Sequence, residues 1–377
     1  MKVVVLGGDG FCGWPTALKL AKEGHTVSIV DNLSRRDIDE QLNSYSLTNI
    51  SSMQERIDAA RIHGLNISFA NIDIALDYEV FKTYISIIKP AAIVHFAEQR
   101  AAPYSMISDK ERRYTVDNNI STTHNVLNAI VEVDKDIHLV HLGTMGVYGY
   151  SKDFGDIPEG YLNVKINSTD KDVDILYPTN PGSVYHMTKS IDQLLFQFYN
   201  KNWNLKITDL HQGIVWGAQT KETSLDPKLV NRFDYDGIYG TVLNRFLVQA
   251  SNKHDLTVYG TGGQKRAFIH IEDTAKCVIL AVETPPVDTS KVRIFNQVSE
   301  VRSVRELAEM LESKISYINN PRKELAENDL SVSNEGLKSL GFKPTTLSDE
   351  LLNDVKFLSA KNAGNFNKDN VLTSPEW

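Results

Sequence analysis

The sequence predicts an α/β fold in which a doubly wound parallel sheet is followed by a smaller second domain. Short apolar, β-branched runs alternate with helix-like segments up to about residue 215, a pattern typical of parallel strands joined by crossover helices. A glycine-rich turn, "GGDGFCG", separates the first apolar run from the first helix. Beyond 215 the alternation loosens. We therefore predict one domain over 1–215 and a second over 216–377, with a chain that crosses back to the first domain.

The elements follow from the hydrophobic pattern in chain order. Apolar runs bounded by glycine, proline or polar residues predict strands at 2–6, 26–32, 66–74, 91–97, 137–144 and 205–213. Amphipathic or polar stretches predict helices at 11–24, within 34–63, at 113–133 and from Ser183 onward. The second domain is expected to contain a helix within 234–250, a strand–glycine loop–strand–helix unit at 256–282, a helix capped by Ser303 and, after about residue 360, a polar tail forming an extended arm.

Composition and charge limit the function classes. The 377 residues are 41% hydrophobic and carry a formal net charge of −8 without a basic stripe, which argues against a nucleic-acid partner. An 18-residue apolar run is absent, so no membrane span is expected. The first strand begins at Lys2, which leaves no room for a targeting peptide and predicts a cytoplasmic location. Cys12 and Cys277 fit no metal or disulfide motif, so we expect two packed side chains and no metal site.

Glycines between the first strand and its helix predict a dinucleotide site. They allow a tight turn and let the backbone and the helix N-terminus approach a pyrophosphate. Asp31 ends the second strand, where a carboxylate binds both ribose hydroxyls of NAD and repels a 2′-phosphate; the nearby Arg35 and Arg36 are the argument for NADP. We predict a Rossmann-like domain that binds NAD. The residues expected to contact it are Gly7, Gly10, Gly13, Asp31, Asn32, Arg36, Asp73, Ile74, Asn118, Tyr185, Lys189 and Val215.

Two of these predicted contacts have plainer alternatives. Asp31 precedes Asn32 and could simply be a turn residue. Asp73 could accept a hydrogen bond from the adenine amino group or cap the following helix.

The segment "YHMTK" places Tyr185 and Lys189 four residues apart on a predicted helix, hence on one face. Thr144 ends the fifth strand, at the carboxyl edge where ligands bind in such sheets. A phenol normally titrates near pH 10, and a neighbouring ammonium group favours its ionised form. Tyr185 can then take a proton from a sugar hydroxyl while a hydride leaves the same carbon. The three residues predict a catalytic group in which Thr144 orients that hydroxyl.

These motifs resemble those of the extended short-chain dehydrogenase/reductase family, the epimerases and dehydratases of nucleotide sugars. The similarity covers nearly the whole chain and is closest to family members that join sulfite to a UDP-sugar. The segments that carry it are "GGDGFCGWPTALKL", "VDNLSRR", "FAEQRAAPYSM", "LGTMG", "YHMTKS", "QGIVWG", "NRFDYDGIYGTVLNRF" and "VYGTGGQKR".

The resemblance implies bound NAD, and UDP-glucose and sulfite as substrates, with free sulfite or a sulfite-donating protein as the source. Carbon 4 is oxidised, water is lost across carbons 5 and 6, sulfite adds to carbon 6, and carbon 4 is reduced again. The sulfonated product would serve sulfolipid or glycan synthesis. The family also implies a homodimer that pairs through the helix before the fifth strand and the Tyr185 helix.

"EQR" at 98–100 is unusual beside a nicotinamide site and is explained by a bound oxyanion. Arg100 is expected to hold sulfite or the sugar through its fixed N–H donors, with Gln99 and Gln212 as neutral donors; alternatively Glu98 and Arg100 pair with each other. His186 is the predicted acid or base for dehydration, unless it lies on the helix surface.

Family members commonly carry an acidic residue where this chain has Val147. Glu98 and His186 are therefore the candidates to abstract the carbon 5 proton.

Arg266, in a glycine loop before a strand, is expected to bind the UDP pyrophosphate. Arg232 and Gln264 are its predicted companions, and Tyr259 either lies beside uracil or belongs to the core.

Two other functions fit the sequence. A UDP-sugar 4-epimerase or 4,6-dehydratase would use the same scaffold but leave "EQR" unexplained. A non-catalytic NAD(H)-sensing protein would not need Thr144, Tyr185 and Lys189 together.

Overall fold

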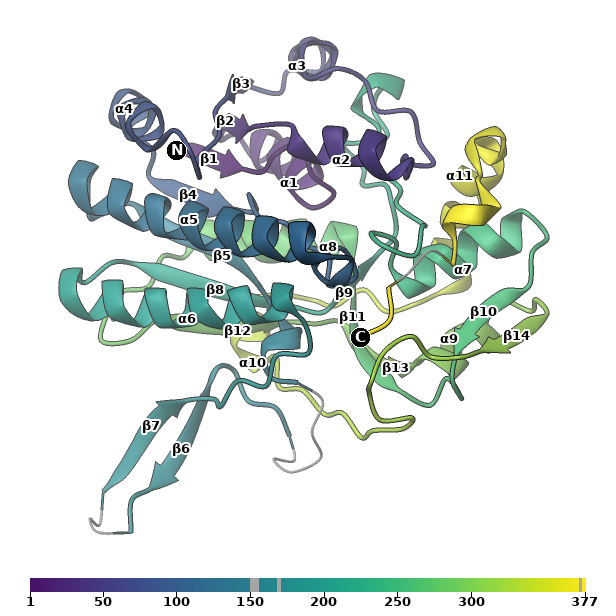
Figure 1. The fold of residues 1–377 in the computed structure, drawn as a ribbon. Coiled ribbons are helices and arrows are strands. Elements are labelled where there is room, and N and C mark those ends of the chain that lie inside the picture. The colour runs from purple at the N-terminus through teal and green to yellow at the C-terminus, as the bar shows by residue number, and fades with distance from the viewer. Residues whose placement is uncertain (150–155, 168–170, 373–374) are drawn as a thin grey trace.

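The computed structural model describes residues 1–149, 156–167, 171–372 and 375–377. Its centre is a parallel sheet in the order β12-β8-β5-β4-β1-β2-β3 (Figure 1). The seven strands are β1 Lys2–Leu6, β2 Thr26–Asp31, β3 Ile67–Asn71, β4 Ala92–His95, β5 His138–Thr144, β8 Ile207–Gln212 and β12 Arg293–Gln297. The strand order reverses between β1 and β4, which is where ligands bind in doubly wound sheets. The predicted fold class is confirmed.

Helices cover both faces of this sheet (Figure 1). One face packs against α1 Gly13–Lys22, α3 Met53–Ile62 and α8 Ile271–Glu283, and the other against α4 Tyr78–Ile88, α5 Asp109–Val133 and α6 Val184–Trp203. Val3 and Val5 point to the first face and Val4 and Leu6 to the second, because successive strand residues alternate. A strand buried on both sides is therefore apolar throughout, as "VVVL" is.

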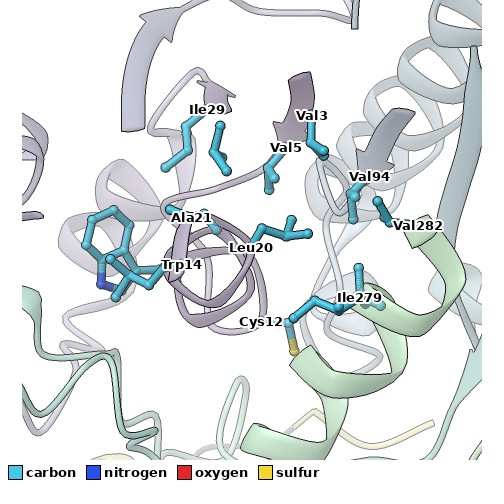
Figure 2. Close-up of a cluster of buried hydrophobic side chains, with 14 of the residues drawn as sticks. Val3, Val5, Cys12, Trp14, Leu20, Ala21, Ile29, Val94, Ile279 and Val282 are labelled. Atoms are coloured by element: carbon cyan, nitrogen blue, oxygen red, sulfur yellow. The ribbon is translucent and has the colours of Figure 1, made fainter. Parts of the chain in front are cut away.

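Figure 2 shows the first of these two cores. Val3 and Val5 of β1 meet Leu20 of α1, and Ile279 and Val282 of α8 close the cluster beside them. Because α8 comes from the second half of the sequence, this packing shows that the chain crosses back to the central sheet. β12 follows α8 and pairs with β8 in parallel, so it adds the seventh strand.

The remaining elements build a smaller region beyond the carboxyl edge. β9 Ile214–Trp216, β11 Lys265–His270 and β13 Glu300–Ser303 form one small sheet, and β10 Leu256–Tyr259 pairs with β14 Ile315–Ile318. The helices of this region are α7 Val242–Ser251, α9 Val304–Glu309 and α11 Asp349–Lys361, whereas α10 Glu335–Ser339 packs against β12 of the central sheet. Phe246, Phe268, Leu307 and Leu352 belong to its separate core.

Several boundaries differ from the sequence prediction. The polar stretch 34–63 forms two helices, α2 Ser34–Leu42 and α3, and α5 begins at Asp109 because the Ser108 hydroxyl accepts from Lys110 N. The hairpin of β6 Tyr161–Lys165 and β7 Asp172–Leu176 was not predicted; Figure 1 shows it projecting from the sheet.

The extended arm expected after residue 360 is wrong. α11 reaches Lys361, short turns follow, and Val371 joins the core of the second region at 4% exposure. Phe366 and Val371 of the tail therefore pack against the second region.

Both cysteines are free and buried, as expected. Within the described residues, every helix is too short or too polar to cross a bilayer.

Candidate active site

A large cleft of about 1070 Å³ lies along the carboxyl edge of the sheet, between the strand ends and the second region. It brings together nearly all of the residues predicted from the sequence. Those lining it are Gly7, Gly10, Gly13, Asp31, Asn32, Asp73, Ile74, Gln99, Arg100, Asn118, Thr144, Tyr185, His186, Lys189, Gln212, Val215, Arg232, Gln264 and Arg266. Arg36 is the exception, since its side chain turns away from the cleft lining.

At two positions of the turn after β1, any side chain would clash with the backbone, so only glycine fits. Gly7 has φ of +77°, and a Cβ there would stand 2.7 Å from Ala97 N. A Cβ on Gly13 would stand 2.1 Å from Gly7 O. The first turn of α1 carries no acidic residue, and the Cys12 side chain makes no capping bond. The positive end of α1 is therefore left for an anion, which fits the pyrophosphate of a dinucleotide.

Asp31 ends β2 at the cleft and accepts hydrogen bonds from Asp9 N at 2.9 Å and Leu33 N at 2.7 Å. Burial and the nearby Asp9 carboxylate raise its pKa to about 6. A carboxylate has about four lone-pair sites, so acceptor capacity remains for ribose hydroxyls.

Asp73 does not cap the next helix, since α4 is preceded by Asp77 at its N-cap, and its contact with adenine stays a prediction. Asp73 accepts from Asn32 Nδ2 at 2.9 Å and from Leu76 N at 3.1 Å, while also lining the cleft.

The two arginines that argued for NADP are both committed to carboxylates. Arg36 binds Asp9 through Nε at 2.7 Å and Nη2 at 2.8 Å. Arg35 pairs with Asp39 and stacks over the Tyr239 ring, 3.6 Å from its centroid. A 2′-phosphate would meet the Asp31 carboxylate and compete for these pairs. The geometry therefore fits NAD.

The predicted catalytic residues meet at the centre of the cleft. Tyr185 and Lys189 lie on α6, whose start is fixed by Ser183, and Thr144 ends β5. Thr144 hydrogen bonds to the Tyr185 side chain. Burial raises the pKa of the Tyr185 phenol, and Glu98 adds to that rise, while the Lys189 and Arg100 charges and the Thr144 bond oppose it. The phenol is therefore protonated at neutral pH, and it must lose this proton before it can act as a base.

Glu98 pairs with Lys189 rather than with Arg100. Its Oε2 lies 3.0 Å from Lys189 Nζ, and its Oε1 lies 3.2 Å from His141 Nε2 and accepts from Thr123 at 3.0 Å. Burial opposes ionisation, but Lys189 and His141 outweigh it and lower the pKa of Glu98.

Arg100 instead binds Asp234 at 2.6 Å. The alternative in which Glu98 and Arg100 pair with each other is therefore wrong. The two side chains point to different partners, Lys189 and Asp234.

His186 lies in the cleft, so the helix-surface alternative is wrong. Its Nδ1 is 3.0 Å from Ser183 Oγ, and the ring passes so close to Gly146 that a Cβ there would stand 2.3 Å from Nε2. Burial, together with the charges of Arg322 and Arg266, lowers the pKa of His186 to about 4. The ring is therefore neutral at physiological pH. Val147, by contrast, is buried in a separate apolar cluster.

Two predicted neutral donors are occupied within the protein. Gln99 donates to Ala101 O and Thr115 Oγ1, both at 3.1 Å, and accepts from Ala101 N. Gln212 donates to Thr274 Oγ1 at 3.2 Å. These amides form part of the cleft wall. To donate to a substrate, each would first have to break the hydrogen bonds that it makes within the protein.

A group of arginines that sequence reasoning only partly identified lies at the second-region end of the cleft. Arg266 pairs with Glu324, Arg245 donates to Tyr259 Oη at 3.3 Å, and Arg322 lies close enough for its charge to act on both groups. Burial lowers the pKa of Arg322, and Nε of both Arg245 and Arg322 has no hydrogen-bond partner. Unpaired buried donors next to an excess of positive charge fit a diphosphate.

Arg232 does not belong to that arginine group. Its guanidinium binds Asp39 of α2 and lies 3.7 Å from Asp234. Arg245 could have been suspected from the sequence through "TVLNRF", part of a segment that carries the resemblance. Nothing in "NNPRKEL" indicates that Arg322 binds a ligand.

The NAD dependent epimerase/dehydratase family model matches residues 3–296. The chain belongs to this family. NAD is therefore its cofactor, as the sequence predicted. The chain is 42% identical to the chloroplastic UDP-sulfoquinovose synthase of Spinacia oleracea, across 100% of this chain and 79% of the relative. It is also 42% identical to the UDP-sulfoquinovose synthase of Sulfolobus acidocaldarius, across 95% and 91%.

Among solved structures, the UDP-glucose 4-epimerase of Thermotoga maritima with UDP-glucose matches this fold with a TM-score of 0.70. The match covers 96% of this chain and 100% of the epimerase at 21% identity. This family member therefore shares the arrangement of the sheet and the second region.

NAD affinity should fall in acid because the Asp31 carboxylate must be ionised to accept from ribose hydroxyls. Its pKa in the free protein is raised to about 6, so full affinity is present above that pH and is lost as the pH falls through it. By linkage, the Kd of nucleotide-free protein for NAD should rise about tenfold near pH 5 relative to near pH 8. Fluorescence titration measures it, and Asp31→Asn should bind weakly with little dependence on pH. An unchanged Kd in wild-type protein would remove Asp31 from the ribose site.

Proposed function

We propose that the protein is a UDP-sulfoquinovose synthase, which converts UDP-glucose and sulfite to UDP-sulfoquinovose. The observation that carries this proposal is 42% identity along the whole chain to two such enzymes. The cleft supports it because Thr144, Tyr185 and Lys189 lie beside Arg100, a cation that a simple epimerase would not need.

Oxidation at carbon 4 relies on Tyr185 as the base and on Thr144 to orient the hydroxyl. When bound, NAD accepts the hydride and later returns it to the same carbon. The positive charge of Lys189 favours the phenolate. It offsets part of the rise in the Tyr185 pKa that burial causes.

The carbon 4 ketone acidifies the carbon 5 proton, so that water can leave across carbons 5 and 6. Of the two candidate bases, Glu98 is engaged by Lys189 and His141, so its oxygens are not free to take a proton from the sugar. His186 is neutral at physiological pH and lies in the cleft beside Gly146. We therefore assign the proton transfers of dehydration to His186.

The cleft offers a different set of partners to each end of the substrate. Arg245, Arg266 and Arg322 are the proposed partners of the UDP diphosphate, with Gln264 beside them. Arg100 is the proposed partner of sulfite, whether sulfite arrives free or from a donor protein. Its charge acts on Tyr185, so it lies near the reacting end of the sugar.

The competing functions make different products. A 4-epimerase or 4,6-dehydratase would use Tyr185 in the same way, and the similar fold of the epimerase fits that reading. It would not consume sulfite. The cytoplasmic location expected from the sequence stays a prediction.

The proposed activity is tested by incubating the NAD-loaded protein with UDP-glucose and sulfite and measuring the mass of the UDP-sugar product. A sulfonated product is expected, and Tyr185→Phe should bind UDP-glucose without oxidising carbon 4, because the phenylalanine ring has no proton acceptor. A UDP-sugar of unchanged mass but inverted carbon 4 would identify an epimerase instead. Turnover of no UDP-sugar would favour the sensing protein.

Arg100→Ala should weaken sulfite use while leaving the first oxidation in place. Charge-assisted bonds to an oxyanion contribute roughly 1.5–3 kcal/mol each, so the KM for sulfite should rise about tenfold or more. Arg100→Lys, which keeps the charge but not the planar fork, should lie between the two. NADH absorbance after adding UDP-glucose alone is the second measurement. Loss of NADH formation with an unchanged sulfite KM would make Arg100 a sugar-positioning residue.

We also propose a homodimer that pairs through α5 and α6, which lie side by side in Figure 1. Of the apolar residues in the second half of α6, Phe196 and Tyr199 are buried and Leu195 packs against the core, but Leu194 is 63% and Phe198 56% exposed. Replacing both Leu194 and Phe198 by Glu should give a monomer by light scattering, whereas Ile62→Glu, at an exposed position of α3, should not change the mass. A monomeric wild-type protein at micromolar concentration would contradict the dimer.

A further inference from the structure

A row of buried polar side chains leads from Lys189 into the interior of the protein. Lys189 Nζ lies 2.9 Å from His141 Nε2, and His141 Nδ1 lies 2.8 Å from Asp209 Oδ1. Asp209 Oδ2 lies 2.9 Å from His211 Nε2, and His211 Nδ1 lies 2.6 Å from the Tyr148 hydroxyl. These are all hydrogen-bond distances, so the row is continuous from the active-site lysine to Tyr148.

Strand register produces this row. His141 of β5 pairs with Asp209 of β8, and Gly143 pairs with His211. Because alternate strand residues share a face, the three polar side chains stand together beneath α6. Gly143 leaves the space they need: a Cβ there would stand 2.5 Å from Asp209 Oδ1 and 2.9 Å from His211 Cδ2.

The row is costly if its role is only structural. His141, Asp209 and His211 are each at most 1% exposed, and burying ionisable groups carries a desolvation penalty that pairing recovers only in part. The same face begins with Leu139 and Ile207, which pack in an apolar core with Phe196. Continuing that apolar pattern would avoid the penalty, so the polar residues call for a chemical role.

Oxidation of carbon 4 creates a proton that must be placed somewhere. The C4–H and O–H bonds of the sugar break, the carbon–oxygen double bond forms, the hydride passes to the nicotinamide, and the hydroxyl proton passes to Tyr185. The proton that Tyr185 held at rest must first move away, toward Lys189. Lys189 is an ammonium group, so a proton that reaches Nζ displaces one along the hydrogen bond to His141.

We propose that the His141–Asp209–His211 row is a proton store, which holds the proton released by oxidation of carbon 4 and returns it when carbon 4 is reduced. This inference rests on the proposed function. Two imidazoles flank one carboxylate, so the row can take an added proton and share the resulting charge. Glu98 Oε1, 3.2 Å from His141 Nε2, accepts from that nitrogen once it is protonated.

The surroundings of the row support proton uptake by His141. Burial and the Lys189 charge lower the pKa of His141, but Asp209 and Glu98 outweigh them and raise it above its usual value. Other groups also act on the row from the elements around it. They are His95 at the end of β4, Asp192 of α6, Tyr161 of β6 and Glu159 before β6.

The test counts protons. NAD-loaded protein is mixed with UDP-glucose but no sulfite, in weak buffer with a pH indicator, and protons released are compared with NADH formed. Without a store, this oxidation liberates one proton for each NADH; the wild-type protein should release less than about half of that. His211→Gln keeps a hydrogen-bonding side chain but no titratable ring, so its release should rise toward one proton per NADH. Asp209→Asn is the second variant if His211→Gln does not fold.

His138→Gln is the matched control. His138 is also a buried histidine of β5, at 2% exposure, but its Nε2 bonds to Thr208 and lies outside the row. This variant should keep the wild-type proton count. A shift equal to that of His211→Gln would mean that any buried histidine change alters the count, and would overturn the proposal.

An independent measurement follows the histidines directly. In protein labelled with ¹³C-histidine, adding UDP-glucose should move one imidazole signal toward the protonated form, and His211→Gln should alter that shift. Release of one full proton per NADH by the wild-type protein, with unmoved histidine signals, would overturn the proton store while leaving the synthase intact. Failure to form NADH at all would instead overturn the proposed function, and the store with it.

Discussion

The buried ion pair between Lys189 and Glu98 is the contact on which the geometry of the active site depends. Lys189 comes from α6, Glu98 from the segment after β4, and His141 from β5, so one cluster joins three elements. A lysine side chain has many rotamers, but Glu98, His141 and the carbonyl of Leu142 hold Nζ at about one position. Tyr185 lies one helical turn earlier, so the same contacts fix the phenol relative to the strand ends.

That pair also opposes the task usually assigned to the lysine. Lys189 favours the Tyr185 phenolate, while Glu98 raises the pKa of the same phenol. In an enzyme that only oxidises, such a carboxylate would be a disadvantage. In a cycle that returns the hydride to the same carbon, Tyr185 must give its proton back, and a base that is too strong slows this last step. A lysine partly neutralised by Glu98 therefore suits a reaction that runs in both directions on one substrate.

Features encoded by local spacing were predictable, and features that depend on distant partners were not. The strand pattern, the glycine turn and the spacing of Tyr185 and Lys189 each follow from a short window of sequence. The partner of Glu98 lies 91 residues away and that of Arg100 lies 134 residues away, and the loop after β4 has no periodicity to show where each side chain points. β12 was missed because "RIFNQ" is short and polar at both ends, and is recognisable only from its place beside β8.

The net charge of −8 says little about how this protein handles anions, because the charges are balanced locally. On the dinucleotide side, Arg35, Arg100 and Arg232 share Asp39 and Asp234. On the opposite side, Arg245, Arg266 and Arg322 gather beside Glu324, and burial there lowers the pKa of Arg322 because its charge is not fully compensated. A bound diphosphate supplies the missing negative charge. Its binding free energy is therefore more favourable beside Arg245, Arg266 and Arg322 than beside the arginines that Asp39 and Asp234 already neutralise. The cleft thus has a direction, and it positions a nucleotide sugar with its diphosphate among these arginines and its reacting carbons beside Tyr185.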